Sequence, residues 1–218
     1  MKLNVEQTRR LVSRALEAIA TKRDYLNELD RGLGDGDHGT TVARGVKAAV
    51  DLLDAARPAS ANEVFTSTGS AMMKSMGGAS GVLFGTFFLG AKACPDAQEL
   101  DTGTLLAFFK SGLNNLKQKT KAQRGDKTML DALVPAVDAL AQDDQESRPL
   151  DAALKHAADA AEQGAKSTVG LLPRFGRART LGERAAAVQD PGATSVSLFV
   201  RGLSDHVSEA HGSGATGS

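Results

Sequence analysis

The pattern that most constrains the fold of this chain is the spacing of its apolar residues, which recur at steps of three and four. Near the N-terminus, Val5, Val12, Leu16 and Ile19 follow this spacing with charged residues between them, as on the buried face of an amphipathic helix. The same period predicts helices at residues 5–28, 39–56, 61–75, 102–119, 127–142, 150–168 and 193–210, and a charge-free segment at 75–91 is counted as an eighth. One Ile, one Tyr and no Trp leave few residues that favour strands, so the chain is predicted to be all-α.

The predicted helices are expected to pack as a single domain. Short connections make helices that follow one another antiparallel neighbours, and no stretch has the composition of an interdomain linker. Residues 1–210 are therefore assigned to one domain, and the Gly/Ser-rich end from His211 to Ser218 is expected to be a disordered tail.

The segment from Ser75 to Ala91 carries no charge and suits either a buried central helix or a short membrane span. Its seventeen residues are interrupted by five glycines, which favours the buried helix.

The charge of the chain excludes several classes of partner. Its 26 basic and 26 acidic residues give no net charge, so it lacks the basic excess of proteins that bind nucleic acid or anionic membranes. The N-terminus has no apolar run of a secretory signal, and the single cysteine, Cys94, cannot form an internal disulfide. We expect a cytoplasmic protein.

Three carboxylates, Asp30, Asp35 and Asp37, fall within eight residues of a glycine-rich stretch that leads into the helix at 39–56. Carboxylates crowded in this way repel one another unless a cation or solvent intervenes, and oxygen-only ligands suit a hard ion. The spacing does not match the twelve-residue calcium loop, so Mg²⁺ with a phosphate ligand is the preferred interpretation and Ca²⁺ a minor alternative.

The glycines at 34, 36 and 39 allow tight turns and close approach to a ligand. The N–H groups of residues 38–41 would open the following helix and could bind phosphate. The alternative is an ordinary Asp/Gly turn in which Asp37 caps that helix.

A second glycine turn, Gly77 to Gly81, opens the charge-free helix with further N–H groups and the hydroxyl of Ser80. Its alternative is simple close packing of helices.

A third element is the irregular stretch at 169–191, in which four arginines stand on a glycine-punctuated loop: Arg174, Arg177, Arg179 and Arg184. They could fold over phosphates as charged donors, and the alternative is a solvated basic loop. A loop of this length in a compact domain is more often a functional lid than filler.

Four segments in order identify a family: LGDGDHGTTVARG (33–45), GGASGVLFGTFF (77–88), RGDKTMLDAL (124–133) and GRARTLGERAAAVQDPGATS (176–195). Together they resemble the L subunit of dihydroxyacetone kinases. The resemblance implies an eight-helix antiparallel, up-and-down barrel with a nucleotide site at one end.

The resemblance also implies particular site residues. Asp30, Asp35 and Asp37 would hold two Mg²⁺ ions that grip the phosphates of ATP or ADP. The other implied nucleotide contacts are the phosphate-binding residues His38, Gly39, Thr40, Thr41, Ala79 and Ser80, the pocket residues Thr120, Thr128, Met129, Asp190, Pro191 and Gly192, and Arg177 on the lid. Beyond this metal–nucleotide site the chain would supply no catalytic residue of its own.

In this family a separate K subunit holds the hydroxyketone substrate covalently, so the resemblance implies a kinase subunit that is inactive without that partner. The substrate would be dihydroxyacetone or a close relative such as a tetrulose. The phosphoryl group would come either from exchanged ATP or from a phosphohistidine carrier of the sugar phosphotransferase system. The competing functions are a non-catalytic, nucleotide-responsive regulatory module and a fatty-acid kinase, and the QDPGATS segment argues against the latter.

Overall fold

A computed structural model of the chain describes residues 1–212, except for the side chain of Arg177. The α-helices are α1 (Val5–Ala20), α2 (Arg23–Arg31), α3 (His38–Ala55), α4 (Ala61–Met76), α5 (Gly78–Leu89), α6 (Thr102–Lys119), α7 (Leu130–Gln145), α8 (Leu150–Lys166) and α9 (Pro191–Gly212). Two 3-10 helices, η1 (Gly90–Ala93) and η2 (Arg177–Ala185), and two strands, β1 (Leu3–Asn4) and β2 (Glu99–Leu100), complete the described elements.

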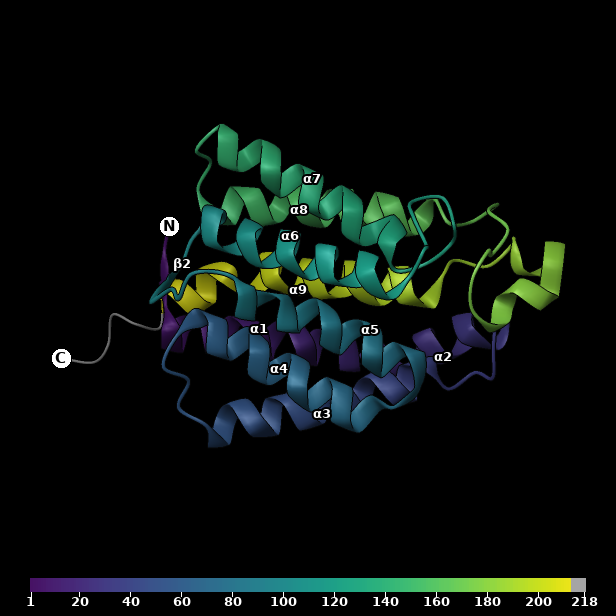
Figure 1. Cartoon of the computed structure of the whole chain (residues 1–218), viewed down its shortest axis with the longest axis horizontal. Coiled ribbons are helices and arrows are strands. Elements are labelled where there is room, and N and C mark those ends of the chain that lie inside the picture. The colour runs from purple at the N-terminus through teal and green to yellow at the C-terminus, as the bar shows by residue number, and fades with distance from the viewer. Residues whose placement is uncertain (213–218) are drawn as a thin grey trace.

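Eight of these helices form a closed ring of contacts. Each contacts the next in the order α1, α3, α4, α5, α6, α7, α8 and α9, and α9 contacts α1. Figure 1 shows them side by side along the long axis of the molecule, with α2 and η2 at one end and β2 at the other. The all-α, single-domain fold is confirmed, and the regular barrel geometry stays a prediction.

Phenylalanines from four helices meet edge to face in the core. The ring centroids of Phe65 and Phe108 lie 5.1 Å apart, and those of Phe88 and Phe199 are also separated by 5.1 Å. These pairs join α4 to α6 and α5 to α9, and such arrangements stabilise a core beyond the area that they bury. The charge-free segment is a buried helix only over α5, because Ser75 and Met76 end α4 and Gly90 and Ala91 belong to η1. No helix in residues 1–212 is long and apolar enough to cross a membrane.

The single helix predicted over 5–28 is wrong, because the structure divides it into α1 and α2. Lys22 leaves the helical conformation between them, with φ −97° and ψ 15°. The hydroxyl of Thr21 donates to the carbonyl of Ala18 at 2.7 Å, a local bond that competes with the helical ladder. The break frees α2 to turn against α3, with which it has many contacts.

Other boundaries also differ from the predicted ones. The helix predicted from residue 127 begins at Leu130, and the last helix starts at Pro191 and includes His211 and Gly212, which were expected in the tail. The rest of that expected tail, residues 213–218, lies outside the described residues. The strands β1 and β2 were not predicted, because two residues are too few to show an alternating pattern.

Candidate functional site

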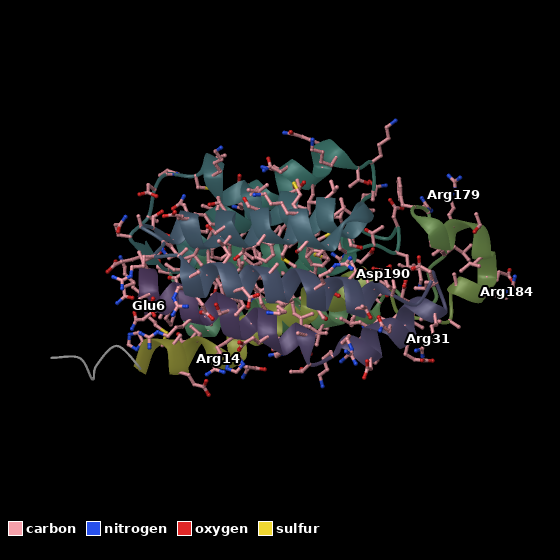
Figure 2. All side chains as sticks on the ribbon, turned by 90° about the horizontal axis from the view of Figure 1, so that it is seen from below. Glu6, Arg14, Arg31, Arg179, Arg184 and Asp190 are labelled. Carbon is pink, nitrogen blue, oxygen red and sulfur yellow. The ribbon has the colours of Figure 1, made fainter. Side chains whose placement is uncertain are left out.

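A cavity of about 900 Å³ opens at the end of the ring that carries α2 and η2. Figure 2 shows Arg31, Arg179 and Arg184 at this end of the molecule, with Glu6 at the opposite end. The first residues of four helices line the cavity: His38 of α3, Gly78 of α5, Leu130 of α7 and Pro191 of α9. Helix N-termini carry the positive end of the helix dipole, so this cavity suits an anion.

The acidic loop on one wall of the cavity is organised by Asp30, which stands in the last turn of α2. Its Oδ2 accepts hydrogen bonds from the backbone N–H groups of Gly36 at 2.9 Å, Asp37 at 3.0 Å and His38 at 3.2 Å. A Cβ on Gly34 would lie 2.7 Å from Oδ1 of Asp30, and Gly36 has a φ of +77°. Position 36 therefore suits glycine for its backbone conformation, and a side chain at position 34 would have to displace the Asp30 carboxylate.

The loop brings the three predicted metal ligands together. Carboxylate oxygens of Asp30, Asp35 and Asp37 lie within 4.8 Å of one another, with Asp30 half-buried and the other two exposed. An all-oxygen donor set of this kind fits a hard divalent cation such as Mg²⁺. The alternative role of Asp37 as a helix cap is wrong, because its side chain makes no capping hydrogen bond to α3.

His38 fastens the start of α3 to α9. Its Nε2 lies 2.9 Å from the hydroxyl oxygen of Ser195, and both residues are buried. Burial lowers the pKa of His38, while the charge of Asp30 and a hydrogen bond to the Pro191 carbonyl oppose that shift. The imidazole is therefore neutral near pH 7 and acts as a polar link between two helices.

Gly39 and Thr40 do not belong to the cavity wall in this structure. Both the N–H and the hydroxyl of Thr40 are occupied by the side chain of Asn27, at 2.9 and 3.0 Å. A Cβ on Gly39 would lie only 2.0 Å from the carbonyl oxygen of Arg23, so this glycine is where α2 and α3 approach most closely. Their roles in phosphate binding stay predictions.

The glycine turn between α4 and α5 forms a second wall and is held by Arg44 of α3. The guanidinium of Arg44 donates to the carbonyls of Ser75 at 2.7 Å and Met76 at 2.6 Å, at the end of α4. Gly77 and Gly78 follow with φ values of +72° and +58° and reverse the chain. The sequence reasoning missed Arg44, although its place in the first turns of the helix after the acidic loop was a usable signal.

The α6–α7 loop, residues 120–129, forms a third wall. Both carboxylate oxygens of the buried Asp131 accept backbone N–H groups of this loop, from Gly125 at 2.5 Å and Thr128 at 2.7 Å. The hydroxyl of Thr120 accepts the N–H of Ala122 at 3.0 Å. These bonds keep the segment out of α7 and turn Thr120, Thr128 and Met129 to the cavity.

Most of the predicted site residues meet at this cavity. Those on its wall are Asp30, Asp35, Asp37, His38, Thr41, Ala79, Ser80, Thr120, Thr128, Met129, Asp190, Pro191 and Gly192. Phe175, Gly176 and Ala178 add the arginine-rich segment to the wall, whereas the side chain of Arg177 lies outside the described residues. Besides Arg44, the sequence reasoning missed Lys119 and Lys127.

Asp190, at the start of α9, is the carboxyl group of the site with the largest shift in acidity. Its Oδ2 accepts the N–H of Ala193 at 2.7 Å. Burial raises its pKa to about 7, against the opposing effects of this bond and of the Lys127 charge, while the nearby charge of Asp131 adds to the rise.

The raised pKa predicts a pH-dependent stability that Asp190→Asn should remove. Between about pH 4 and pH 7, Asp190 is protonated in the folded state and ionised in the unfolded state. The free energy of unfolding therefore falls as pH rises through that window. Urea unfolding at several pH values should show the variant gaining free energy of unfolding relative to wild type up to about pH 7 and no further. A difference that is constant with pH would contradict this assignment.

Comparison with known proteins finds similarity to subunits of dihydroxyacetone kinases and to longer kinases. Residues 32–205 match the family model described as the DAK2 domain. The PEP-dependent dihydroxyacetone kinase, ADP-binding subunit DhaL, of Escherichia coli K12 is 39% identical over 204 residues, which cover 93% of this chain and 97% of that protein. A D-erythrulose kinase of Mycolicibacterium smegmatis is 36% identical over 91% of this chain, which matches 35% of its length. The structure of the C. freundii dihydroxyacetone kinase in complex with AMP-PNP and Mg²⁺ superposes with a TM-score of 0.67 at 26% identity, over 91% of this chain and 33% of that one.

Proposed function

This chain belongs to the DAK2 domain family, and on that premise we propose that it is the Mg-nucleotide-binding, phosphoryl-transfer subunit of a dihydroxyacetone (or related hydroxyketone) kinase. The resemblance recognised from four sequence segments agrees with the family match over residues 32–205. Relatives of similar length are named as ADP-binding subunits, and longer relatives as complete kinases.

One observation carries the proposal: three clustered carboxylates and the N-termini of four helices face the same cavity. Phosphates need both kinds of partner, because a cation must offset their charge and N–H donors must fix their orientation. Asp30, Asp35 and Asp37 would hold Mg²⁺, with two ions as the proposed number, and the metal supplies charge neutralisation when it is bound.

We assign the remaining site residues to different parts of the nucleotide. His38, Thr41 and the turn at Ala79 and Ser80 bind the phosphates, while Thr120, Thr128, Met129 and the turn from Asp190 to Gly192 bind the nucleoside. Arg177 belongs to the lid. Catalysis in such a site is mainly positioning, since phosphoryl transfer needs aligned groups and offset charge more than covalent help from the protein.

The acceptor hydroxyl would be brought by a second protein. We propose a K subunit that holds the hydroxyketone covalently and docks on the cavity end, so that the present chain is inactive alone. Support comes from exposed apolar side chains on segments at that end, namely Tyr25, Val82, Val169, Leu172 and Phe175. Exposed apolar side chains grouped in this way suit a protein interface.

The phosphoryl source is proposed to be ADP that stays bound and is rephosphorylated in place by a phosphohistidine carrier in the cytoplasm. The support is that the Escherichia coli relative described above is PEP-dependent and ADP-binding by name. The alternative is free exchange of ADP for ATP.

Purification without added nucleotide tests the proposal. Denaturing the protein and separating the released compounds by chromatography should yield close to one ADP per chain. Adding a substrate-loaded K subunit, Mg²⁺ and either ATP or the phosphohistidine carrier should then give the phosphorylated sugar. An empty chain that binds ATP only with Mg²⁺ would favour exchange, whereas nucleotide binding without turnover in both reconstituted assays would identify a regulatory module instead.

A further inference from the structure

Lys127, in the α6–α7 loop, is an unusual lysine. Its side chain is buried, with 2% of the residue exposed, and its backbone has a φ of +59°. Its ammonium group donates to the carbonyl of Thr168 at 2.5 Å and to the carbonyl of Val188. The proposed function assigns no role to this residue.

The carbonyls of Thr168 and Val188 lie at the two ends of one segment that connects α8 to α9. Residues 171–187, which we call the lid segment, lie between Thr168, which follows the end of α8, and Asp190, which precedes α9. At the base of this segment the N–H of Gly170 donates to the carbonyl of Ala186 at 2.8 Å, and the N–H of Asp190 donates to the hydroxyl of Thr168 at 2.9 Å. Lys127 lies in a different loop and bonds to residues at both ends of the lid segment, so it holds these two ends together.

A second contact fastens the lid segment to the same α6–α7 loop. The N–H of Arg174 donates to the carbonyl of Asp126 at 3.3 Å, and its guanidinium lies 3.5 Å from the Asp126 carboxylate. The Asp126 carboxylate is buried, but the Arg174 side chain is largely exposed, and solvent weakens the attraction in such a pair. The buried bonds of Lys127 are therefore the stronger attachment.

The environment of Lys127 indicates that a lysine is needed here for its two hydrogen bonds and not for filling space. Burial lowers its pKa, against the opposing charges of Asp190 and Asp131. An apolar side chain could fill a buried space without desolvating an ammonium group, and glycine or asparagine would adopt the positive φ more readily. Strain and desolvation of this kind persist where the surrounding structure needs a particular contact.

We propose that Lys127 is a positioning residue that anchors the base of the lid segment and thereby holds the turn from Asp190 to Gly192 against the cavity. The part of this inference that concerns nucleotide rests on the proposed function. The anchoring itself does not, because it concerns only contacts within the chain.

Limited trypsin digestion of Lys127→Met without nucleotide tests the anchoring. The lid segment has four arginines, at 174, 177, 179 and 184. Because trypsin cleaves after arginine, the cleavage rate at these sites measures how often the segment opens. We expect cleavage at these sites to accelerate about tenfold, while cleavage elsewhere and the helical circular dichroism stay as in wild type. The matched control is Lys121→Met, an exposed lysine of the same loop, which should leave the rate of cleavage at the lid arginines unchanged.

Two results would overturn the anchoring: unchanged cleavage at the lid arginines, or equal acceleration over the whole chain, which indicates global destabilisation. If Lys127→Met does not fold, Lys127→Asn decides, because asparagine adopts the positive φ more readily and its side chain is too short to reach the carbonyls of Thr168 and Val188. Acceleration confined to the lid arginines in that variant supports the anchoring, and its absence refutes it.

A second measurement connects the anchor to the proposed function. ADP affinity at saturating Mg²⁺ should fall about tenfold in Lys127→Met and remain unchanged in Lys121→Met. If the wild-type protein binds no ADP, the proposed function is refuted, and the anchoring is then tested by the digestion experiment alone. Wild-type binding with no loss in Lys127→Met would refute the link between the anchor and the cavity.

Discussion

Replacing Asp35 and Asp37 together with asparagine is expected to remove Mg²⁺-dependent ADP binding without unfolding the protein. Both side chains are exposed, whereas Asp30, which accepts three backbone N–H groups, keeps the loop in shape. The affinity for ADP in Mg²⁺ should fall at least about 100-fold, because two of three carboxylate donors are lost. Isothermal titration calorimetry with and without Mg²⁺ measures the change.

The same double variant should be at least as stable as wild type in metal-free buffer. Carboxylates within 4.8 Å of one another repel, and removing two of them relieves that repulsion. Mg²⁺ should raise the Tm of wild type only, since a ligand stabilises the state that binds it. Asp138→Asn with Asp205→Asn removes the same charge from exposed sites away from the cavity and should leave ADP binding intact. Mg²⁺-dependent binding within about threefold of wild type would show that Asp35 and Asp37 are not ligands.

The fold was largely predictable because it depends on apolar periodicity, which a sequence displays directly. Seven of the eight ring helices follow that pattern, and the charge-free α5, which does not, was recognisable as a buried helix from its length and its glycines. The break at Thr21 and Lys22 was not, because nothing in the periodicity marks it. It depends on the hydroxyl of Thr21 bonding to Ala18 and on α2 packing against α3.

The site was predictable where its residues are close in sequence. Asp30, Asp35 and Asp37 share one loop, so their spacing alone indicated a cation site. Lys127 and Arg44 were missed because their partners are distant: Lys127 bonds to carbonyls 41 and 61 residues away, and Arg44 to carbonyls more than 30 residues away. A backbone carbonyl leaves no mark on a sequence, since every residue has one.

Gly39→Ala is expected to disturb both the fold and the acidic loop. The new Cβ would lie 2.0 Å from the Arg23 carbonyl oxygen and 2.9 Å from Oδ1 of Asn27, so α2 must move away from α3. Such overpacking costs roughly 1–3 kcal/mol of unfolding free energy. Because Asp30 is carried by α2, its bonds to the loop N–H groups should weaken as well, and ADP affinity in Mg²⁺ should fall by about tenfold or more. Urea unfolding and calorimetry measure the two effects.

The control for that substitution is Gly103→Ala in the first turn of α6. There a new Cβ would meet only carboxylate oxygens, Asp144 Oδ1 at 3.1 Å and Asp101 Oδ1 at 3.8 Å, which can move aside. Alanine is favoured over glycine inside a helix by up to about 1 kcal/mol, so this variant should be as stable as wild type or more so. The sequence suggested that Gly39 provides a tight turn, but only Gly36 of the loop glycines has a positive φ. If Gly39→Ala matched Gly103→Ala in stability and ADP affinity, close packing of α2 on α3 would not be what holds Asp30 at the cavity.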